Sequence, residues 1–397
     1  MITPVLTPAP LGPVTLRNRV IKAATFEGMS PQGRITDALV DFHRAYAAGG
    51  VGMTTVAYCA VSMEGRGAPS EIVLRPESLP GLTRLAEVVH AEGAAVSAQI
   101  GHAGPVGNKR VTKAKALCAS SGWSPLGTRF SAASTDDIAR ITADFASGAR
   151  LLADAGFDAV ELHMGHHYLL NSFLSPRWNK RKDAYGGSLE ARARLPREVA
   201  TAVRETVGTR IAVTAKFEMT DAVPGGLWLD QSVPIAQLLE SDGHLDALQL
   251  TAGGSLANPM FLFRGDVPRE EFSQTLPVYL RPAFKLVGKR FMPAYPFEES
   301  YFRPLARQFR SALSMPLIAL GGINELASME QALDDGFAFV ALGRALLREP
   351  DLVNTLAQGQ RTSSLCIHCN KCMPSIYSGT HCVLVEPSSR PGVRLLG

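Results

Sequence analysis

The sequence predicts a single (β/α)8 barrel with a short Cys-rich C-terminal extension. Short apolar segments alternate with longer amphipathic segments along most of the 397 residues, which is typical of parallel α/β folds. There are eight such apolar segments, and eight parallel strands can close into a barrel that leaves no exposed sheet edge. A barrel of about 250 residues with insertions fits this length. We therefore expect a barrel domain over residues 1–360 and an extension over 361–397.

The predicted elements follow one another in the order that such a barrel requires. The eight predicted strands cover residues 20–24, 52–57, 95–100, 158–162, 211–216, 245–250, 316–320 and 337–342. Amphipathic segments predict helices at 37–48, 80–92, 136–155, 189–207, 231–241 and 325–335. We expect Asn324 to cap the last of these helices and Gly336 to end it. Two long irregular inserts, 104–133 and 253–297, follow strands and should lie on the catalytic face of the barrel.

Composition excludes several classes of function. The net charge is only +4, and the only basic run is 180–182, which we interpret as a solvated loop, so a nucleic-acid surface is not expected. The N-terminal residues do not resemble a signal peptide, and no window offers about 18 uninterrupted apolar residues, so no membrane association is expected. These observations favour a cytoplasmic location.

The segment after the fourth predicted strand carries the strongest chemical signal. His163 and His166 stand three residues apart, and Tyr168 follows two residues later. In a barrel, side chains at the carboxyl ends of strands form the active site. Two imidazoles at this spacing can donate hydrogen bonds to a substrate, or they can ligate a metal ion together with a carboxylate. A metal-dependent lyase or hydrolase therefore stays open as an alternative.

Two glycine turns at the ends of the last two predicted strands indicate a phosphate site. One contains Gly321 and Gly322, and the other contains Gly343 and Arg344. Glycines allow backbone N–H groups to approach phosphate oxygens closely, and the helix that starts after each turn adds a favourable dipole. Together the two turns match the usual phosphate site of an α/β barrel.

Two polar residues near strand ends match the remaining needs of a flavin. The amide of Gln99 offers both a donor and an acceptor, as the pyrimidine edge of flavin requires. Lys216 supplies a cation that would stabilise negative charge on reduced flavin. An ion pair of Lys216 with Glu218 or Asp221 is the structural alternative.

These motifs together resemble the old yellow enzyme family of FMN-dependent NADH:flavin oxidoreductases and ene-reductases. The resemblance covers nearly all of residues 5–360 and includes the family-like landmarks Ser175-Pro176 and Gly186-Gly187. It implies that the barrel binds FMN non-covalently. The cofactor-binding positions that it implies are Ala23, Ala24, Thr25, Tyr58, Gln99, Lys216, Gly321, Gly322, Gly343 and Arg344.

The resemblance also implies a reaction. His163 and His166 would donate hydrogen bonds to the carbonyl or nitro oxygen of an enone-like small molecule. Hydride from NADH or NADPH would pass through FMN to the activated C=C bond, and Tyr168 would add the proton. An amine dehydrogenase or demethylase and a non-catalytic electron-transfer subunit are alternatives.

Three residues depart from the family pattern. Lys216 stands where an arginine is usual, Phe26 where many members carry Thr or Cys, and His167 where Gly is more typical. Lysine keeps the charge but loses the bidentate geometry of arginine. We expect Phe26 to alter redox tuning and His167 to narrow the pocket or change its pH dependence.

The extension contains four closely spaced cysteines, Cys366, Cys369, Cys372 and Cys382, in a C-x2-C-x2-C-x9-C pattern. Thiolates at this spacing can converge on one metal centre. The pattern resembles the iron–sulfur segment of the 2,4-dienoyl-CoA reductase and trimethylamine dehydrogenase branch, which implies a [4Fe-4S] cluster and a separate electron-transfer partner. A zinc site and free thiols remain alternatives. A homo-oligomer is also compatible with the sequence.

Overall fold

Eight parallel strands close into the predicted barrel in the computed structural model, which describes residues 3–107, 112–124 and 127–392. Each strand pairs with the next along the chain, and the first also pairs with the last, which completes the ring. The strands are β3 (Val20–Lys22), β4 (Met53–Ala60), β6 (Ala95–Gly101), β10 (Ala159–Met164), β11 (Ala212–Glu218), β12 (Ala247–Thr251), β13 (Leu317–Ala319) and β14 (Phe339–Leu342). All eight predicted strands are present, so the predicted fold class is confirmed.

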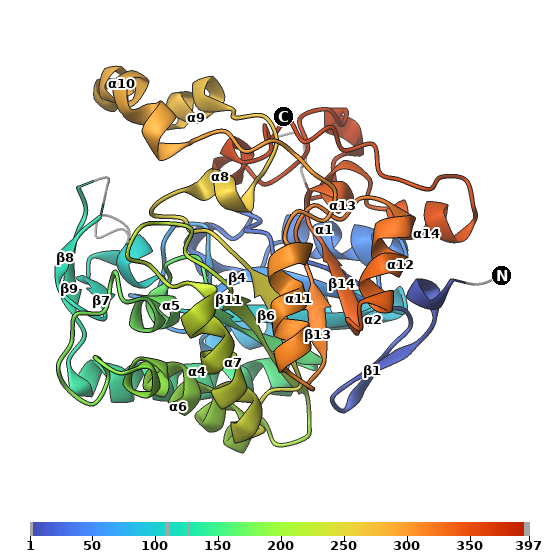
Figure 1. Cartoon of the computed structure of the whole chain (residues 1–397). Coiled ribbons are helices and arrows are strands. Elements are labelled where there is room, and N and C mark those ends of the chain that lie inside the picture. The colour runs from blue at the N-terminus through green and yellow to red at the C-terminus, as the bar shows by residue number, and fades with distance from the viewer. Residues whose placement is uncertain (1–2, 108–111, 125–126, 393–397) are drawn as a thin grey trace.

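Helices surround this sheet on the outside (Figure 1). They are α1 (Asp37–Ala48), α2 (Leu79–Ala91), α4 (Thr135–Asp154), α6 (Leu189–Val207), α7 (Leu229–Asp242), α11 (Arg303–Ala312), α12 (Leu326–Asp334), α13 (Arg344–Arg348) and α14 (Leu352–Ala357). The ranges of the helices α11, α13 and α14 were not predicted from the sequence. A long apolar cluster joins the inner faces of these helices to the outer faces of the strands, and its burial stabilises the barrel.

The predicted cap of α12 is wrong. The helix begins one residue later, with Glu325 at the N-cap and no side-chain cap hydrogen bond. The amide of Asn324 instead contacts the carboxylate of Glu299 at 3.3 Å and the ring of His368 at 3.0 Å. The end of the helix is as predicted, because Gly336 adopts a left-handed φ of +91°.

A hairpin of β1 (Ala9–Leu11) and β2 (Val14–Leu16) covers the amino-terminal end of the barrel. Its apolar side chains pack against residues that point into the barrel from the strands, including Ile21, Ala212 and Phe339. This end of the barrel is therefore closed by an apolar plug. A cavity within the barrel must therefore lie toward the other end.

Both predicted inserts contain regular structure. The described part of insert 104–133 forms a small sheet of β7 (Ala116–Cys118), β8 (Gly122–Trp123) and β9 (Arg129–Ala132). Residues 108–111 and 125–126 of this insert lie outside the described residues. Insert 253–297 contains α8 (Pro259–Leu262), α9 (Arg269–Thr275) and α10 (Arg281–Phe291), which share a small apolar core.

The C-terminal segment lies next to insert 253–297, on the side of the molecule away from the β1–β2 hairpin (Figure 1). The two segments are joined by backbone hydrogen bonding, because Asp266 N–H donates to His368 O at 3.0 Å. Among the described residues, no helix has the length and apolar character needed to cross a membrane.

Candidate active site

A cavity of about 320 Å³ opens at the carboxyl ends of the barrel strands. Its wall includes every residue that the sequence analysis assigned to catalysis or to cofactor binding. These are Ala23, Ala24, Thr25, Tyr58, Gln99, His163, His166, Tyr168, Lys216, Gly321, Gly322, Gly343 and Arg344. The fold thus gathers these positions in one place, while their individual roles remain predictions.

The turn after β10 holds two histidines and a tyrosine in close contact. The ring of Tyr168 stacks on that of His163 with centroids 4.2 Å apart, and the ring of His166 lies edge-on 5.2 Å from His163. Nδ1 of His163 accepts from the Gly165 N–H at 3.3 Å, so the proton of a neutral His163 ring resides on Nε2. Nε2 of His166 contacts Oγ1 of Thr251 at 2.8 Å.

Burial determines the charge state of these groups. The pKa of His163 lies well below its usual value, mainly because the ring is buried and to a smaller extent because of the charges of His166 and Lys216. Burial, followed by Lys216 and His167, lowers the pKa of His166 to about 3. Burial also raises the pKa of Tyr168. At neutral pH the site therefore presents two neutral imidazoles and a protonated phenol, all of which can donate hydrogen bonds.

The backbone at His166 is held by a carboxyl group that the sequence analysis did not assign to this role. The His166 N–H donates to Oε2 of Glu218 at 2.6 Å, at the end of β11. This bond supports the left-handed φ of +58° that directs His166 into the cavity. Glu218 is fully buried, and burial, followed by the charge of Asp221, raises its pKa well above the usual range.

A second carboxylate lies at the polar centre of the barrel. Glu161 on β10 contacts Lys216 Nζ at 3.2 Å through Oε1, and the same oxygen accepts from Gln99 Nε2 at 2.7 Å. Its other oxygen accepts from Gln249 Nε2 at 2.8 Å. The partner of Lys216 is therefore Glu161, and the proposed ion pair with Glu218 or Asp221 is wrong.

The register of the sheet explains this arrangement. Glu161 is the pairing partner of Gln99 across β10 and β6, and Lys216 is the partner of Gln249 across β11 and β12. Glu161 and Gln249 were missed in the sequence, although each is a polar residue inside an otherwise apolar strand. A buried polar residue in such a strand needs a hydrogen-bond partner, and that requirement was the available signal.

The two glycine turns at the predicted phosphate end of the cavity differ in their surroundings. Gly321 and Gly322 both have positive φ, at +106° and +74°. A Cβ on Gly321 would lie 2.3 Å from the ring of Phe302, and one on Gly322 would lie 2.4 Å from the ring of Tyr301. A Cβ on Gly343 would meet no protein atom within 4 Å, so the backbone there borders open space.

These features fit FMN, the cofactor that the resemblance implies. The glycine turns and Arg344 line one end of the cavity and would hold the phosphate there. Glu161 holds the amide of Gln99 and the ammonium of Lys216 at the polar centre, where they would bind the pyrimidine ring. Phe26 also lines the cavity and adds an apolar side chain without hydrogen-bonding capacity.

His167 does not narrow the cavity. Its fully buried ring does not line the cavity wall and packs 5.4 Å from the ring of Trp178. The ring also fills the space beside Gly254, where a Cβ would lie 2.1 Å from the imidazole. The expectation that His167 narrows the pocket is therefore wrong. The left-handed backbone at His166 and His167 turns the His167 ring away from the cavity and toward Gly254.

The four cysteines of the extension are unpaired, and only Cys372 lines the cavity. In the described part of the chain, no group of three or more His, Cys, Asp or Glu side chains is arranged to hold a metal ion. The predicted ligand set of Cys366, Cys369, Cys372 and Cys382 is therefore not assembled in this structure. Burial raises the pKa of Cys372 to about 12, so its thiol is protonated at neutral pH.

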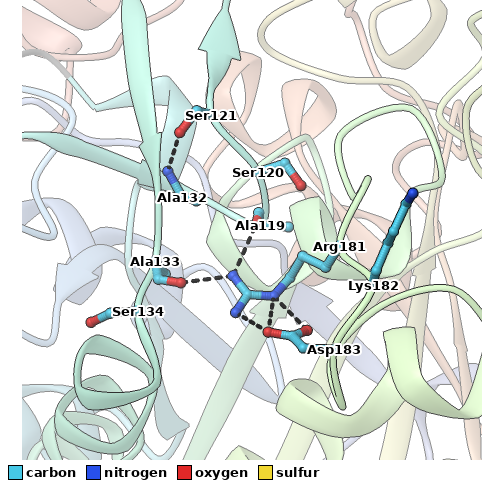
Figure 2. A pocket seen from close by; sticks show the side chains of 9 residues that line it. All are labelled: Ala119, Ser120, Ser121, Ala132, Ala133, Ser134, Arg181, Lys182 and Asp183. Carbon is cyan, nitrogen blue, oxygen red and sulfur yellow. Dashed lines mark hydrogen bonds and ion pairs between the residues drawn. The ribbon is translucent and has the colours of Figure 1, made fainter.

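A shallower hollow of about 570 Å³ lies elsewhere on the surface (Figure 2). Its most prominent side chain, Arg181, donates to the carbonyl oxygens of Ala119 at 3.0 Å and Ala133 at 2.7 Å and pairs with Asp183 at 2.6 Å. Lys182 points away from this guanidinium (Figure 2). Arg181 is only 10% exposed, so the interpretation of the basic run as a solvated loop is wrong for this residue, which ties the loop to the insert.

Comparison with known proteins agrees with the fold and with the family that the sequence resembles. The model of the NADH:flavin oxidoreductase / NADH oxidase family matches residues 4–240. A 4,4'-dithiodibutanoate disulfide reductase from Rhodococcus erythropolis is 55% identical over 381 residues, which cover 96% of this chain and 94% of that protein. A metal reductase from Desulforamulus reducens is 31% identical over 403 residues, which cover 97% of this chain and 56% of that longer protein.

Solved structures share the fold at lower sequence identity. Morphinone reductase in complex with tetrahydroNAD is 23% identical with a TM-score of 0.72, and the match covers 94% of this chain and 93% of that one. A 2-naphthoyl-CoA reductase is 22% identical with a TM-score of 0.79, and the match covers 93% of this chain and 54% of that one. The family match, supported by the 55% identical relative, carries the assignment. The chain therefore belongs to the NADH:flavin oxidoreductase / NADH oxidase family, also known as the old yellow enzyme family, and is an FMN-dependent NAD(P)H oxidoreductase.

Proposed function

We propose that the protein reduces the activated C=C bond of a small α,β-unsaturated carbonyl or nitro compound. The observation that carries this proposal is the joint placement of His163, His166 and Tyr168 on one wall of the cavity that fits FMN. Bound FMN would relay a hydride from NADH or NADPH to the substrate. The overall reaction consumes one NAD(P)H and one proton and converts C=C into CH–CH.

In this proposal the two histidines bind the oxygen of the substrate. Both rings are neutral at neutral pH because burial lowers the pKa of each. A neutral imidazole donates one hydrogen bond, and Nε2 of His163 is the donor because Nδ1 already accepts from Gly165. Two donors on one oxygen withdraw electrons from the conjugated alkene, so its β-carbon accepts hydride more readily.

Tyr168 is the proposed proton donor. Its phenol is buried beside His163, and burial raises its pKa, so it carries its proton throughout the neutral range. The proton goes to the α-carbon after the β-carbon has received hydride. A positioned general acid contributes about 10²- to 10⁴-fold to such a step.

Disulfide reduction is a second candidate, because a relative that is 55% identical over nearly its whole length is a 4,4'-dithiodibutanoate disulfide reductase. In that reaction NAD(P)H supplies two electrons and one proton, the S–S bond breaks, and a second proton yields two thiols. Under this candidate Tyr168, which lines the cavity, would supply that second proton to the departing thiolate. Under this candidate the histidines would not need to polarise a carbonyl.

Parallel turnover assays distinguish the two candidates. The FMN-loaded enzyme is assayed anaerobically for oxidation of NADH and of NADPH with 2-cyclohexen-1-one and, separately, with 4,4'-dithiodibutanoate. We expect turnover of the enone, with kcat/KM reduced about 10²- to 10³-fold in His163→Ala. The control is His244→Ala, in the loop that enters β12 at the other end of the barrel. Turnover of the disulfide alone, with His163→Ala as active as the wild type, would replace ene-reduction with disulfide reduction.

The metal content, partner and location of the protein remain proposals that rest on the sequence. The C-x2-C-x2-C-x9-C spacing alone supports a [4Fe-4S] cluster or zinc in the extension, and no catalytic step is assigned to it. Analysis of iron, acid-labile sulfide and zinc in the purified protein tests this proposal. We also propose a separate electron-transfer partner, a homo-oligomer and a cytoplasmic location.

A further inference from the structure

Asn370 connects the Cys-rich segment to the wall of the cavity. The residue is 1% exposed and adopts a left-handed φ of +56°. Its Nδ2 donates to the carbonyl oxygens of Phe263 at 2.7 Å and Asp266 at 2.9 Å, both in insert 253–297. Its Oδ1 accepts a hydrogen bond from Nη1 of Arg344. One side-chain amide thus joins the extension, the insert and the start of α13.

Arg344 is held on the same side by two further contacts. Its Nη1 also donates to the Arg264 carbonyl oxygen at 2.8 Å, and its Nη2 donates to the hydroxyl of Tyr301 at 3.4 Å. That hydroxyl in turn donates to the Leu262 carbonyl oxygen at 2.7 Å. Among the described residues, three of the five N–H groups of Arg344 therefore have protein partners, and two remain for a ligand.

The remaining N–H groups belong to a side chain that lines the FMN cavity. Arg344 directly follows Gly343, whose backbone borders open space at the phosphate end. A long arginine side chain loses rotamer freedom when it binds an anion, and partners that fix it beforehand reduce that cost. The contacts from Asn370, the Arg264 carbonyl and Tyr301 fix one edge of the guanidinium in this way.

We propose that Asn370 is a positioning residue for FMN binding, which holds Arg344 in the orientation that binds the phosphate group. This inference rests on the assignment of FMN to the cavity. Asparagine suits the role because its amide donates to backbone carbonyls with one atom and accepts from arginine with the other. An aspartate would place a negative oxygen against the carbonyls of Phe263 and Asp266 and would pair with Arg344 in competition with phosphate.

The position of Asn370 also makes its hydrogen bond to Arg344 sensitive to changes at the neighbouring cysteines. Asn370 lies between Cys369 and Cys372, and Cys372 itself lines the cavity. A rearrangement of this segment would therefore act on the same hydrogen bond to Arg344. The phosphate end of the cavity is in this sense built jointly by the barrel and the extension.

The test compares two flavins that differ only in the phosphate. Dissociation constants of FMN and riboflavin are measured by fluorescence quenching with the flavin-free full-length protein. We expect Asn370→Ala to weaken FMN binding about 10-fold or more, as for loss of a hydrogen bond to a charged group. Riboflavin binding should change less than about 2-fold, because riboflavin has no phosphate for Arg344 to bind. Asn354→Ala, which removes a hydrogen bond from α14 to the Ala48 carbonyl at the end of α1 and does not line the cavity, should leave both constants unchanged.

Further variants test whether Asn370 affects FMN binding through Arg344. Asn370→Ala should have no added effect on FMN binding in an Arg344→Gln background, because the residue acts through the missing guanidinium. Asn370→Asp provides a second variant should the alanine variant not fold, and it should also weaken FMN selectively. Equal weakening of both flavins, or additive effects of Asn370→Ala and Arg344→Gln, would overturn the inference. A wild type that binds neither flavin would overturn the FMN assignment together with it.

Discussion

In the turn after β10, three strands hold His163, His166 and Tyr168 in place, whereas the four thiols of the extension lie near one another but are not arranged as a metal site among the described residues. The imidazole of His163 is fixed by its own turn, and His166 is bound both by Glu218 on β11 and by Thr251 on β12. The extension has short irregular structure, and its hydrogen bonds to the barrel and the insert run through residues such as Thr380, His368 and Asn370 rather than through the thiols. The comparison shows that contacts from neighbouring barrel strands hold the histidine turn in place without any ligand.

The largest expected effect concerns the polar centre that supports the barrel site. Glu161→Ala leaves the ammonium of Lys216, which is 3% exposed, without its carboxylate. Removal of one partner of a buried ion pair costs about 3–5 kcal/mol, so the unfolding free energy should fall by that amount. Denaturant unfolding measures it, with Glu205→Ala on the exposed face of α6 as the control, expected within about 0.5 kcal/mol of the wild type. A loss no larger than that of the control would show that strand contacts alone hold the site.

A smaller effect follows from the protonation state of His166. Burial lowers its pKa from 6.5 to about 3, so between these values the unfolded chain binds a proton that the folded protein does not. The unfolding free energy therefore falls as the pH decreases through this window, and by pH 5 His166 should account for up to about 2 kcal/mol of the loss. His166→Asn should make the decrease between pH 7 and pH 5 shallower by that amount. Parallel pH profiles for variant and wild type would contradict a buried neutral imidazole.

The smallest effect is expected in the extension. Cys369 is only partly buried and has no disulfide partner. In the metal-free protein, Cys369→Ser should therefore change the unfolding free energy by less than about 0.5 kcal/mol, as for most partly exposed substitutions. A much larger loss in the metal-free protein would show that contacts within the chain hold Cys369 as firmly as the residues of the barrel site.

The barrel was predictable because each strand appears in the sequence as a short apolar segment. Eight apolar segments separated by amphipathic helices admit few other arrangements, and the residues at their carboxyl ends must then face one cavity. This reasoning brought His163, Gln99, Lys216 and the glycine turns together without knowledge of any distance.

The remaining features depend on contacts between distant segments. The role of Glu161 follows from the register that pairs it with Gln99, and the sequence of neither strand alone determines that register. The orientation of His167 depends on a left-handed turn, and the buried position of Asn370 depends on how the extension docks on insert 253–297. The helices α9 and α10 were missed because their apolar residues pack on each other and on the insert rather than on the barrel.

Rapid mixing of the NADPH-reduced, FMN-loaded enzyme with an enone under anaerobic conditions tests the proposed roles in the barrel site most directly. We predict that Tyr168→Phe slows the recovery of flavin absorbance about 10²- to 10⁴-fold, because the proton donor is gone. Reduction by NADPH should stay within about 2-fold of the wild type, and the exposed control Tyr279→Phe should leave both steps unchanged. Recovery at the wild-type rate in Tyr168→Phe would contradict the assignment of Tyr168 as the proton donor.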